Sequence, residues 1–268
     1  MMQTNITILS CNYNANDRLQ PAIESWAQSA GFMQNANVGK VSLYITDNNS
    51  KDGSKDYLTN LSKNPDPRFD SCKIFLNDVN CGKAKAVNEM AKIALQDANS
   101  TLLMLIDSDI RICQPEMLAI ACEIGWVTKD KVSAMVCWQT GNSLFKRHFQ
   151  WTKTVKENLP EFNYFVPNEG FGSGIAGGAM FLWNQDWINV GGFRENMGKD
   201  KKPSIYGSND GCLLFDAFSR TNRPIMVIKE LEVYHPPEVD LKYQAWKDSL
   251  HREHIQYGHS ITEKGFFD

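Results

Sequence analysis

Two carboxylates stand one residue apart directly after an apolar segment of the chain. Residues 101–106, TLLMLI, lead into Asp107, Ser108 and Asp109. Because side chains alternate along an extended segment, we expect Asp107 and Asp109 to reach one side together. Two close carboxylates repel each other unless a cation lies with them, and Mg2+ or Mn2+ accepts such oxygen ligands. Such a pair could hold a divalent cation that neutralises a diphosphate leaving group.

A solvated turn rich in aspartate is the alternative, so the meaning of the pair depends on the surrounding elements. Short apolar segments alternate with segments of helical spacing through the first half of the chain. Expected strands cover residues 6–10, 41–47, 73–78, 101–106 and 131–138. Expected helices contain residues 19–30, which end at Gly31 as a C-cap, 57–61 and 84–94. This alternation predicts an α/β fold with a parallel sheet.

Polar residues gather where several of these strands end. They are Asn12, Asn14, Asp47, Asn49, Asn80, Asp107 and Asp109. Ligands of open α/β sheets bind outside the carboxyl ends of the strands. We therefore expect these side chains to line one binding site.

The second half has a different pattern. A glycine-rich segment, residues 171–184, enters a strand, and residues 196–210 form a polar loop. A helix is expected around residues 213–218 and a strand over residues 224–235. We predict one domain over residues 1–238, with a nucleotide-binding half (1–138) and an acceptor half (139–238), followed by a helical tail (239–268).

Composition narrows the classes of protein. The net charge is -3, from 28 basic and 31 acidic residues, which gives no general attraction to nucleic acid or anionic membrane. Seven scattered cysteines without paired spacing indicate a reducing compartment. No segment reaches the roughly 20 apolar residues of a membrane helix, and the first residues lack a signal pattern. We expect a cytoplasmic protein without a transmembrane segment.

Five segments, in order, resemble the motifs of family 2 glycosyltransferases. They are ITDNNSKDGS (45–54), NCGKAKAVNEMA (80–91), LLMLIDSDI (102–110), AGGAMFLWNQDWINVGGFRE (176–195) and SNDGCLLFDAFSR (208–220). The resemblance implies the GT-A fold, a Rossmann-like single domain with a mixed, mostly parallel central sheet flanked by helices. It also implies transfer of a sugar from a nucleotide diphosphate donor, with inversion and with Mn2+ or Mg2+ as cofactor.

The resemblance assigns roles to individual residues. Asp47 would bind the nucleobase or ribose, Asp107 the ribose or the metal, and Asp109 the metal. His235, at the end of the last strand, would complete the metal shell. Further donor contacts are assigned to Asn12, Asn49, Gly82, Lys83, Asn88, Gly177 and Gly178. A solvated helix face is the alternative for Lys83 and for its neighbour Lys85, and Asp52, Gly53 and Ser54 are expected only to shape a turn and cap a helix.

Asp210 is the predicted catalytic base. The reaction needs a carboxylate that takes the proton of the acceptor hydroxyl, and Asp210 begins an expected helix after a polar loop. The alternative for Asp210 is an acid that caps this helix. Asn209 stands where the family usually has Glu, and an amide cannot take that proton.

The donor and the acceptor are less defined by the residues. We expect a UDP-sugar because such donors are frequent in the family. The acceptor could be a saccharide, a lipid-linked sugar or a hydroxylated base of viral DNA, the last because residues 145–156 mix basic and aromatic side chains. A non-catalytic nucleotide-sugar binder or scaffold is the alternative function. A nucleotidyltransferase would need a basic glycine-rich loop after the first strand, and a haloacid-type phosphatase a D-x-D on that strand; both are absent.

Overall fold

The protein is built around one curled sheet. A computed structural model describes residues 4–96, 101–141, 153–154, 163–166, 178–197, 202–203, 209–237 and 245. The strands of the sheet are β1 (Ile6–Asn12), β2 (Val41–Asp47), β3 (Ser71–Leu76), β4 (Leu102–Ile106), β5 (Arg111–Ile112), β6 (Ala134–Thr140), β7 (Lys153–Thr154), β8 (Asn163–Val166), β9 (Ala179–Trp183) and β12 (Ile225–Tyr234). Two short strands, β10 (Asn196–Met197) and β11 (Lys202–Pro203), pair with each other.

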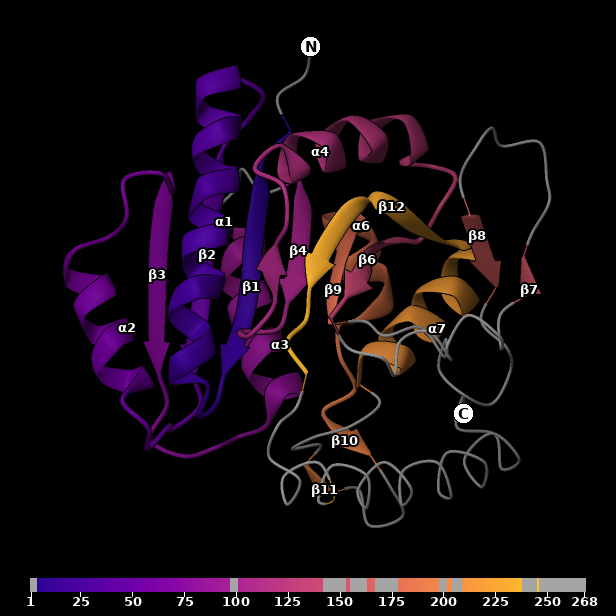
Figure 1. Cartoon of the computed structure of the whole chain (residues 1–268). Helices are drawn as coiled ribbons and strands as arrows, with labels where there is room; N and C mark the ends of the chain where they lie inside the picture. Colours follow the sequence, from indigo (N-terminus) through magenta and orange to yellow (C-terminus); the bar gives the residue numbers. More distant parts are fainter. Residues whose placement is uncertain are drawn as a thin grey trace.

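The strand order is β3-β2-β1-β4-β9-β6-β12-β8-β7, with β5 paired to β12. β1 runs parallel to β2 and β4, β2 parallel to β3, and β6 parallel to β12. Between β4 and β6, β9 is antiparallel to both. The carboxyl ends of β1 to β4, β6 and β12 therefore lie at one edge, toward which the arrowheads of β1, β3 and β12 point in Figure 1.

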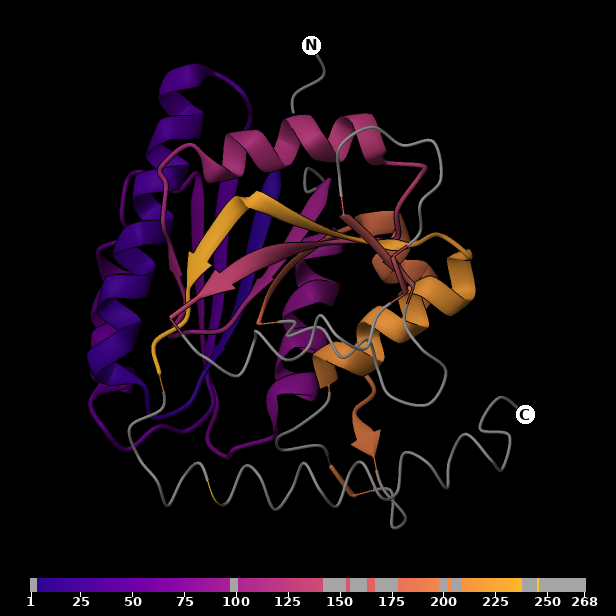
Figure 2. The same cartoon turned by 45° about the vertical axis from the view of Figure 1, so that its right-hand side comes forward.

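Helices cover both faces of this sheet. They are α1 (Asn16–Ala36), α2 (Ser54–Lys63), α3 (Lys83–Gln96), α4 (Met117–Thr128), α6 (Asn184–Val190) and α7 (Asn209–Thr221). α1, α2 and α4 pack on one face, and α3, α6 and α7 on the other (Figures 1 and 2). Strand side chains alternate between the two layers, so Leu102 and Met104 join the first core while Leu103 and Leu105 join the second. Burial on both faces explains why β4 is apolar throughout.

Most predicted elements of the first half are confirmed, with shifted ends. β2 has the predicted bounds, while β1 extends to Asn12 and β3 ends at Leu76, two residues before the predicted end. The predicted C-cap at Gly31 is wrong, because α1 continues to Ala36 and ends on Asn37 in the left-handed conformation, with φ 53°. Gly31 instead packs close to Arg68, whose Cγ would lie 3.3 Å from an added Cβ.

In the second half, the predicted helix and final strand are confirmed as α7 and β12, and the glycine-rich segment leads into β9. The two short strands β10 and β11 fall within the predicted polar loop. The expected tail and residues 145–156 lie outside the described residues, apart from residues 153–154 and residue 245. Among the helices that the structure describes, none combines the length and the apolar character needed to cross a membrane.

Candidate active site

The loops after β1 and β2 are joined by a buried polar contact. Asn12 and Asp47, the last residues of the two strands, are both fully buried. Asn12 Nδ2 donates to Asp47 Oδ2 at 3.0 Å and to Ser50 Oγ at 3.2 Å, and the Ser50 amide donates to Asp47 Oδ1 at 2.9 Å. Asn12 Oδ1 has no hydrogen-bond partner among the described residues. The contact holds a carboxylate in a fixed place at the carboxyl edge of the sheet.

A second amide, Asn48, joins the loop after β2 to the loop after β3. Its Nδ2 donates to Asn80 Oδ1 at 2.7 Å, and its Oδ1 accepts from Asn77 Nδ2 at 3.1 Å and from the Cys81 amide at 3.0 Å. Asn80 Oδ1 also accepts from the Gly82 amide at 2.9 Å. Gly82 has φ 83°, a conformation that favours glycine. Asn48 was not among the predicted site residues, although its position directly after Asp47 could have suggested it.

The predicted donor residue Asn49 has a more exposed position than Asp47. Its backbone is left-handed, with φ 66°, and its Oδ1 accepts from Lys51 Nζ at 2.7 Å. Asp52, two residues further on, accepts from the Ser54 amide and hydroxyl, as its predicted role in the turn requires. It also accepts from the Asn16 amide at 2.8 Å, which ties the start of α1 to this loop. The nucleotide contact of Asn49 stays a prediction.

The acidic pair lies on a tight turn. β4 ends at Ile106, and the Ile110 amide donates to the Asp107 carbonyl at 3.0 Å. The expected extended segment at Asp107 and Asp109 is therefore wrong, since the chain turns at this point and strand alternation does not apply there. The Asp107 amide donates to the Gly178 carbonyl at 2.8 Å, so the residue before β9 fixes the start of the turn.

Gly178 is a glycine because the acidic turn lies against it. An added Cβ at this position would lie 2.8 Å from Ile110 Cδ1 and 3.1 Å from Asp107 Oδ2. Its role next to the acidic pair is thus a close backbone approach. Gly177, the other glycine predicted to contact the donor, lies outside the described residues, and the donor contact of Gly178 stays a prediction.

Lys83 joins the two predicted halves of the site. Its Nζ donates to Asp107 Oδ1 at 2.6 Å and to Asp210 Oδ1 at 2.8 Å. The three side chains are only 24–31% exposed. Burial lowers the pKa of Lys83, but Asp107 and Asp210 outweigh burial and raise it above its ordinary value. Burial raises the pKa of Asp210 to about 6, although Lys83 opposes this rise.

Asp109 faces His235 and Arg18. His235 Nε2 lies 4.0 Å from Asp109 Oδ1, and a guanidinium nitrogen of Arg18 lies 3.5 Å from Asp109 Oδ2. His235 Nδ1 lies 2.9 Å from the Pro236 carbonyl oxygen, an atom that can only accept a hydrogen bond. This contact places the proton of a neutral imidazole on Nδ1 and leaves the Nε2 lone pair on the side of Asp109, as in histidines that bind metals.

The predicted metal ligands fit a divalent cation in chemical type. Two carboxylates and an imidazole form a donor set that Mn2+ accepts, and Asp109 and His235 are already neighbours. Asp107 is engaged by Lys83 instead. Within the part of the chain that the structure describes, no three His, Cys, Asp or Glu side chains are grouped so as to hold a metal ion.

Asn88 connects α3 to the turn after α6. Its Nδ2 donates to the Phe193 carbonyl and to Glu195 Oε1, both at 2.9 Å, and its Oδ1 accepts from the Phe193 amide at 2.9 Å. An added Cβ on Gly192 would lie 2.5 Å from Asn88 Oδ1, so this contact needs a glycine. The Phe193 ring in turn lies 5.8 Å from Lys83 Nζ. Asn88 thus supports the surroundings of Lys83, while its predicted donor contact stays a prediction.

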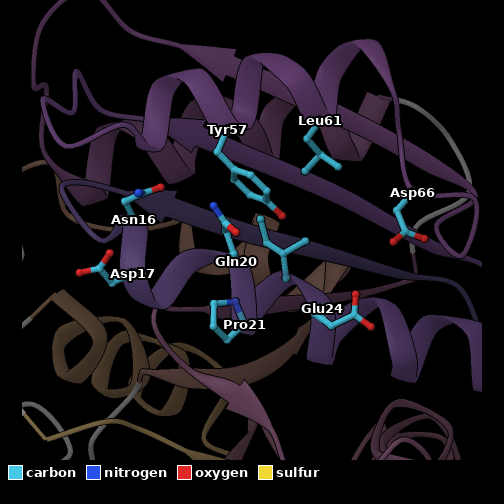
Figure 3. A pocket seen from close by; sticks show the side chains of 9 residues that line it. Asn16, Asp17, Gln20, Pro21, Glu24, Tyr57, Leu61 and Asp66 are labelled. Carbon is cyan, nitrogen blue, oxygen red and sulfur yellow. The ribbon is translucent and has the colours of Figure 1, made fainter.

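A cavity of about 590 Å3 lies between α1 and α2. Figure 3 shows Tyr57, Gln20 and Glu24 at this cavity, with Asn16 and Asp66 toward its two ends. None of its lining residues is a predicted site residue. The acidic cluster around Lys83 is therefore described by its contacts rather than by this cavity.

The structure brings together Lys83, Asp107 and Asp210 in one cluster, and Asp109 and His235 in a second contact. Lys85 is 52% exposed and lies 4.0 Å from Glu89 on its own helix, as its alternative of a solvated helix face requires. Arg18 was missed by the sequence analysis. Its only signal is a position near the start of α1, at the same edge as the acidic pair.

Comparisons with solved structures place this arrangement in a known fold. PcManGT, a mannosyltransferase from Pyrobaculum calidifontis in complex with GDP-Man and Mn2+, matches with a TM-score of 0.63 at 13% identity, over 99% of this chain and 70% of that protein. S. aureus TarS 1-349 matches with a TM-score of 0.57 at 14% identity, over 98% and 74%. GalNAc-T7 with UDP, GalNAc and Mn2+ matches with a TM-score of 0.58 at 12% identity, over 89% and 45%. These likenesses show the predicted GT-A fold.

The comparison by sequence agrees with the fold. A search of curated proteins finds no match. The model of the glycosyl transferase family 2, however, matches residues 7–188, which include the acidic pair, Lys83 and β9. The chain therefore belongs to glycosyl transferase family 2 and is a glycosyltransferase.

Proposed function

We propose that this protein is a metal-dependent, inverting glycosyltransferase that moves a sugar from a UDP-sugar to an acceptor hydroxyl. The observation that carries the proposal is the Lys83 cluster, which holds Asp210 of the second half next to Asp107 of the first. A donor bound along Asp107 would then have its sugar close to a carboxylate that is suited to take a proton. Two structural neighbours were solved with Mn2+ and a nucleotide or nucleotide sugar, which supports a nucleotide-sugar donor.

The donor would lie along the carboxyl edge of the sheet. Asp47, with two oxygens held by Asn12 and Ser50, keeps lone pairs that can accept from a nucleobase or ribose. Asp107, Asp109 and His235 are the residues that would hold Mn2+ or Mg2+. The bound cation would neutralise negative charge that develops on the departing diphosphate.

Asp210 would act on the acceptor. A base works best when its pKa lies near the working pH, and burial raises the pKa of Asp210 to about 6. The acceptor oxygen forms a bond to the anomeric carbon, while the bond from that carbon to the diphosphate oxygen breaks. The acceptor proton passes to the Asp210 carboxylate, and the single displacement inverts the configuration at the anomeric carbon.

The proposal keeps the acceptor as a prediction among three classes: a saccharide, a lipid-linked sugar and a hydroxylated DNA base. Residues 145–156, whose basic and aromatic side chains suggest DNA, lie outside the described residues apart from residues 153–154. The division into a donor half (1–138) and an acceptor half (139–238) stays a prediction.

A ligand screen tests the donor class. Thermal unfolding is measured with UDP, GDP, UDP-sugars and GDP-mannose, each with and without Mn2+. A ligand present at 100 times its dissociation constant should stabilise the fold by about 2.7 kcal/mol. We expect a UDP-sugar to stabilise the protein only with Mn2+, and UDP to be released when acceptors of the three classes are added. Binding of a UDP-sugar without any release of UDP would favour the alternative, a non-catalytic nucleotide-sugar binder. Asn209, in place of the usual Glu, is the sequence feature that favours this alternative.

A further inference from the structure

The ammonium of Lys83 lies where a cation is needed. Asp107 and Asp210 come from segments far apart in the sequence, and their carboxylates would repel each other if they met alone. Lys83 Nζ lies 2.6 Å from an oxygen of the first and 2.8 Å from an oxygen of the second. Charge-assisted hydrogen bonds of this length are strong, so the ammonium offsets the repulsion between the two carboxylates.

The position of Lys83 is itself fixed by its surroundings. Lys83 is the first residue of α3, and the Phe193 ring lies 5.8 Å from its Nζ. Asn88 lies one turn and a half further along the same helix. Its side chain bonds to both the backbone amide and the backbone carbonyl of Phe193. Phe193, held by Asn88, thus helps to direct the Lys83 side chain at the two carboxylates. Lys85 is exposed and has no such support among the described residues.

We propose that Lys83 is an internal counter-cation, which occupies Asp107 in the unloaded site and competes there with the incoming divalent cation. The proposal rests on the proposed function, since it concerns the same metal site. Mg2+ binds carboxylate oxygens at about 2.0–2.1 Å, so a cation on Asp107 would lie within a few ångströms of the ammonium. Metal binding therefore requires Lys83 to release Asp107, while its contact with Asp210 keeps that carboxylate in place.

The consequence is an exchange of partners on loading. Before loading, Lys83 shares its charge between Asp107 and Asp210. After loading, Asp107 has the metal and Lys83 remains beside Asp210 as a positioning residue. The nucleotide-free affinity for metal is then set partly by Lys83, because the cation must displace an ammonium that is already bound.

The test measures the affinity for Mn2+ in the absence of nucleotide. The concentration of free Mn2+ is monitored by electron paramagnetic resonance. Lys83→Met removes the ammonium and keeps a side chain of similar length. We expect it to bind Mn2+ at least about fivefold more tightly than the wild type, the lower end of typical coupling between two sites. Lys83→Arg keeps the positive charge and should stay near the wild type. Lys85→Met removes a charge from the same helix turn outside the site and serves as the matched control.

Unchanged or weaker Mn2+ binding in Lys83→Met would overturn the proposal, as would an equal gain in Lys85→Met. A wild type that binds no Mn2+ would overturn both this proposal and the metal dependence of the proposed function. A gain in Lys83→Met together with no sugar transfer by the wild type would support the counter-cation and reject the transferase activity. The two ideas are thus separated by their readouts.

A second measurement uses the wild type, so that it does not depend on the folding of a variant. Lysine acylation is followed by mass spectrometry with and without Mn2+ alone. Lys83 should be labelled slowly without Mn2+ and faster with it, because it has lost one of its two partners, while labelling of Lys85 stays constant. Equal labelling of Lys83 under both conditions would contradict displacement from Asp107.

Discussion

The site combines two regions that are built in different ways. The loops after β1, β2 and β3 are joined by neutral amides, with Asn48 and Asn12 as their centres. The cluster at the start of α3 is ionic, with one ammonium between two carboxylates. The hydrogen bonds of the amides can stay in place when a ligand binds. In the ionic cluster, by contrast, a metal or an acceptor could replace one partner of each ion pair.

This difference separates a fixed region from an exchanging one. A neutral hydrogen bond contributes about 0.5–1.5 kcal/mol, but a buried polar group that loses its partner costs more. The amide region should therefore respond to mutation mainly in stability. Changing an ion of the cluster should also alter binding and transfer, because Asp107 and Asp210 are the groups proposed to hold the metal and to take the acceptor proton.

The largest effect is expected from Asp210. Asp210→Asn keeps the shape of the side chain but cannot take the acceptor proton. Loss of a general base typically costs about 10²–10⁴-fold in rate, so transfer should fall by that factor. Donor binding, measured by calorimetry, should remain. Asp56→Asn, an exposed acid of the first turn of α2, is the control. A variant of Asp210 with near-normal transfer would remove it as the base.

A smaller effect is expected from pH. Asp210 must be deprotonated to act, and burial raises its pKa from 3.8 to about 6. The kcat/KM for transfer should therefore fall about tenfold per pH unit below pH 6 and level off above it. Since Lys83 lowers the pKa of Asp210, Lys83→Met should shift this acidic limb of the pH profile of kcat/KM to higher pH. A limb near pH 4 in the wild type, measured from initial rates, would mean that an unperturbed carboxyl is the base.

The smallest effect in the series is on stability alone. Asn48→Ala leaves the Cys81 amide and the Asn77 and Asn80 side chains without their shared partner. The free energy of unfolding should fall by about 1–3 kcal/mol, as expected for buried groups left unpaired. Calorimetric melting then records a lower Tm. Asn60→Ala changes an exposed amide on α2 and should stay within about 0.5 kcal/mol. Equal melting of the two variants would contradict a fixed amide region.

The strands at the centre of the fold were predictable because they are buried on both faces. Residues 102–106 form a continuous apolar run, residues 41–47 are mostly apolar or β-branched, and the alternating helices place the two strands in parallel. α4 was not predicted, since its apolar residues are spread around the helix rather than on one stripe. Gly31 misled the prediction, because a glycine inside a helix can serve packing, here against Arg68, instead of ending the helix.

The site residues were predictable by type but not by contact. Motif order singled out Asp107, Asp109, Asp210 and Lys83, and the place of Asp107 and Asp109 at the carboxyl edge follows from the strand β4 that ends just before them. The bond from Lys83 to Asp210 spans 127 positions of the chain and depends on how α3 and α7 meet. Local spacing carries no such information. The turn at Asp107 likewise depends on its contact with Gly178 of the segment before β9.

The central claim is that a cation on the acidic turn binds the donor diphosphate. Its most direct test is the calorimetric affinity for UDP in the wild type and in Asp109→Ala, with and without Mn2+. The account predicts that omitting Mn2+ or removing Asp109 weakens UDP binding. Loss of an outer-shell partner of a metal costs about 10–100-fold in affinity, and we expect at least this loss here. UDP affinity that is equal in both proteins and unaffected by Mn2+ would contradict it.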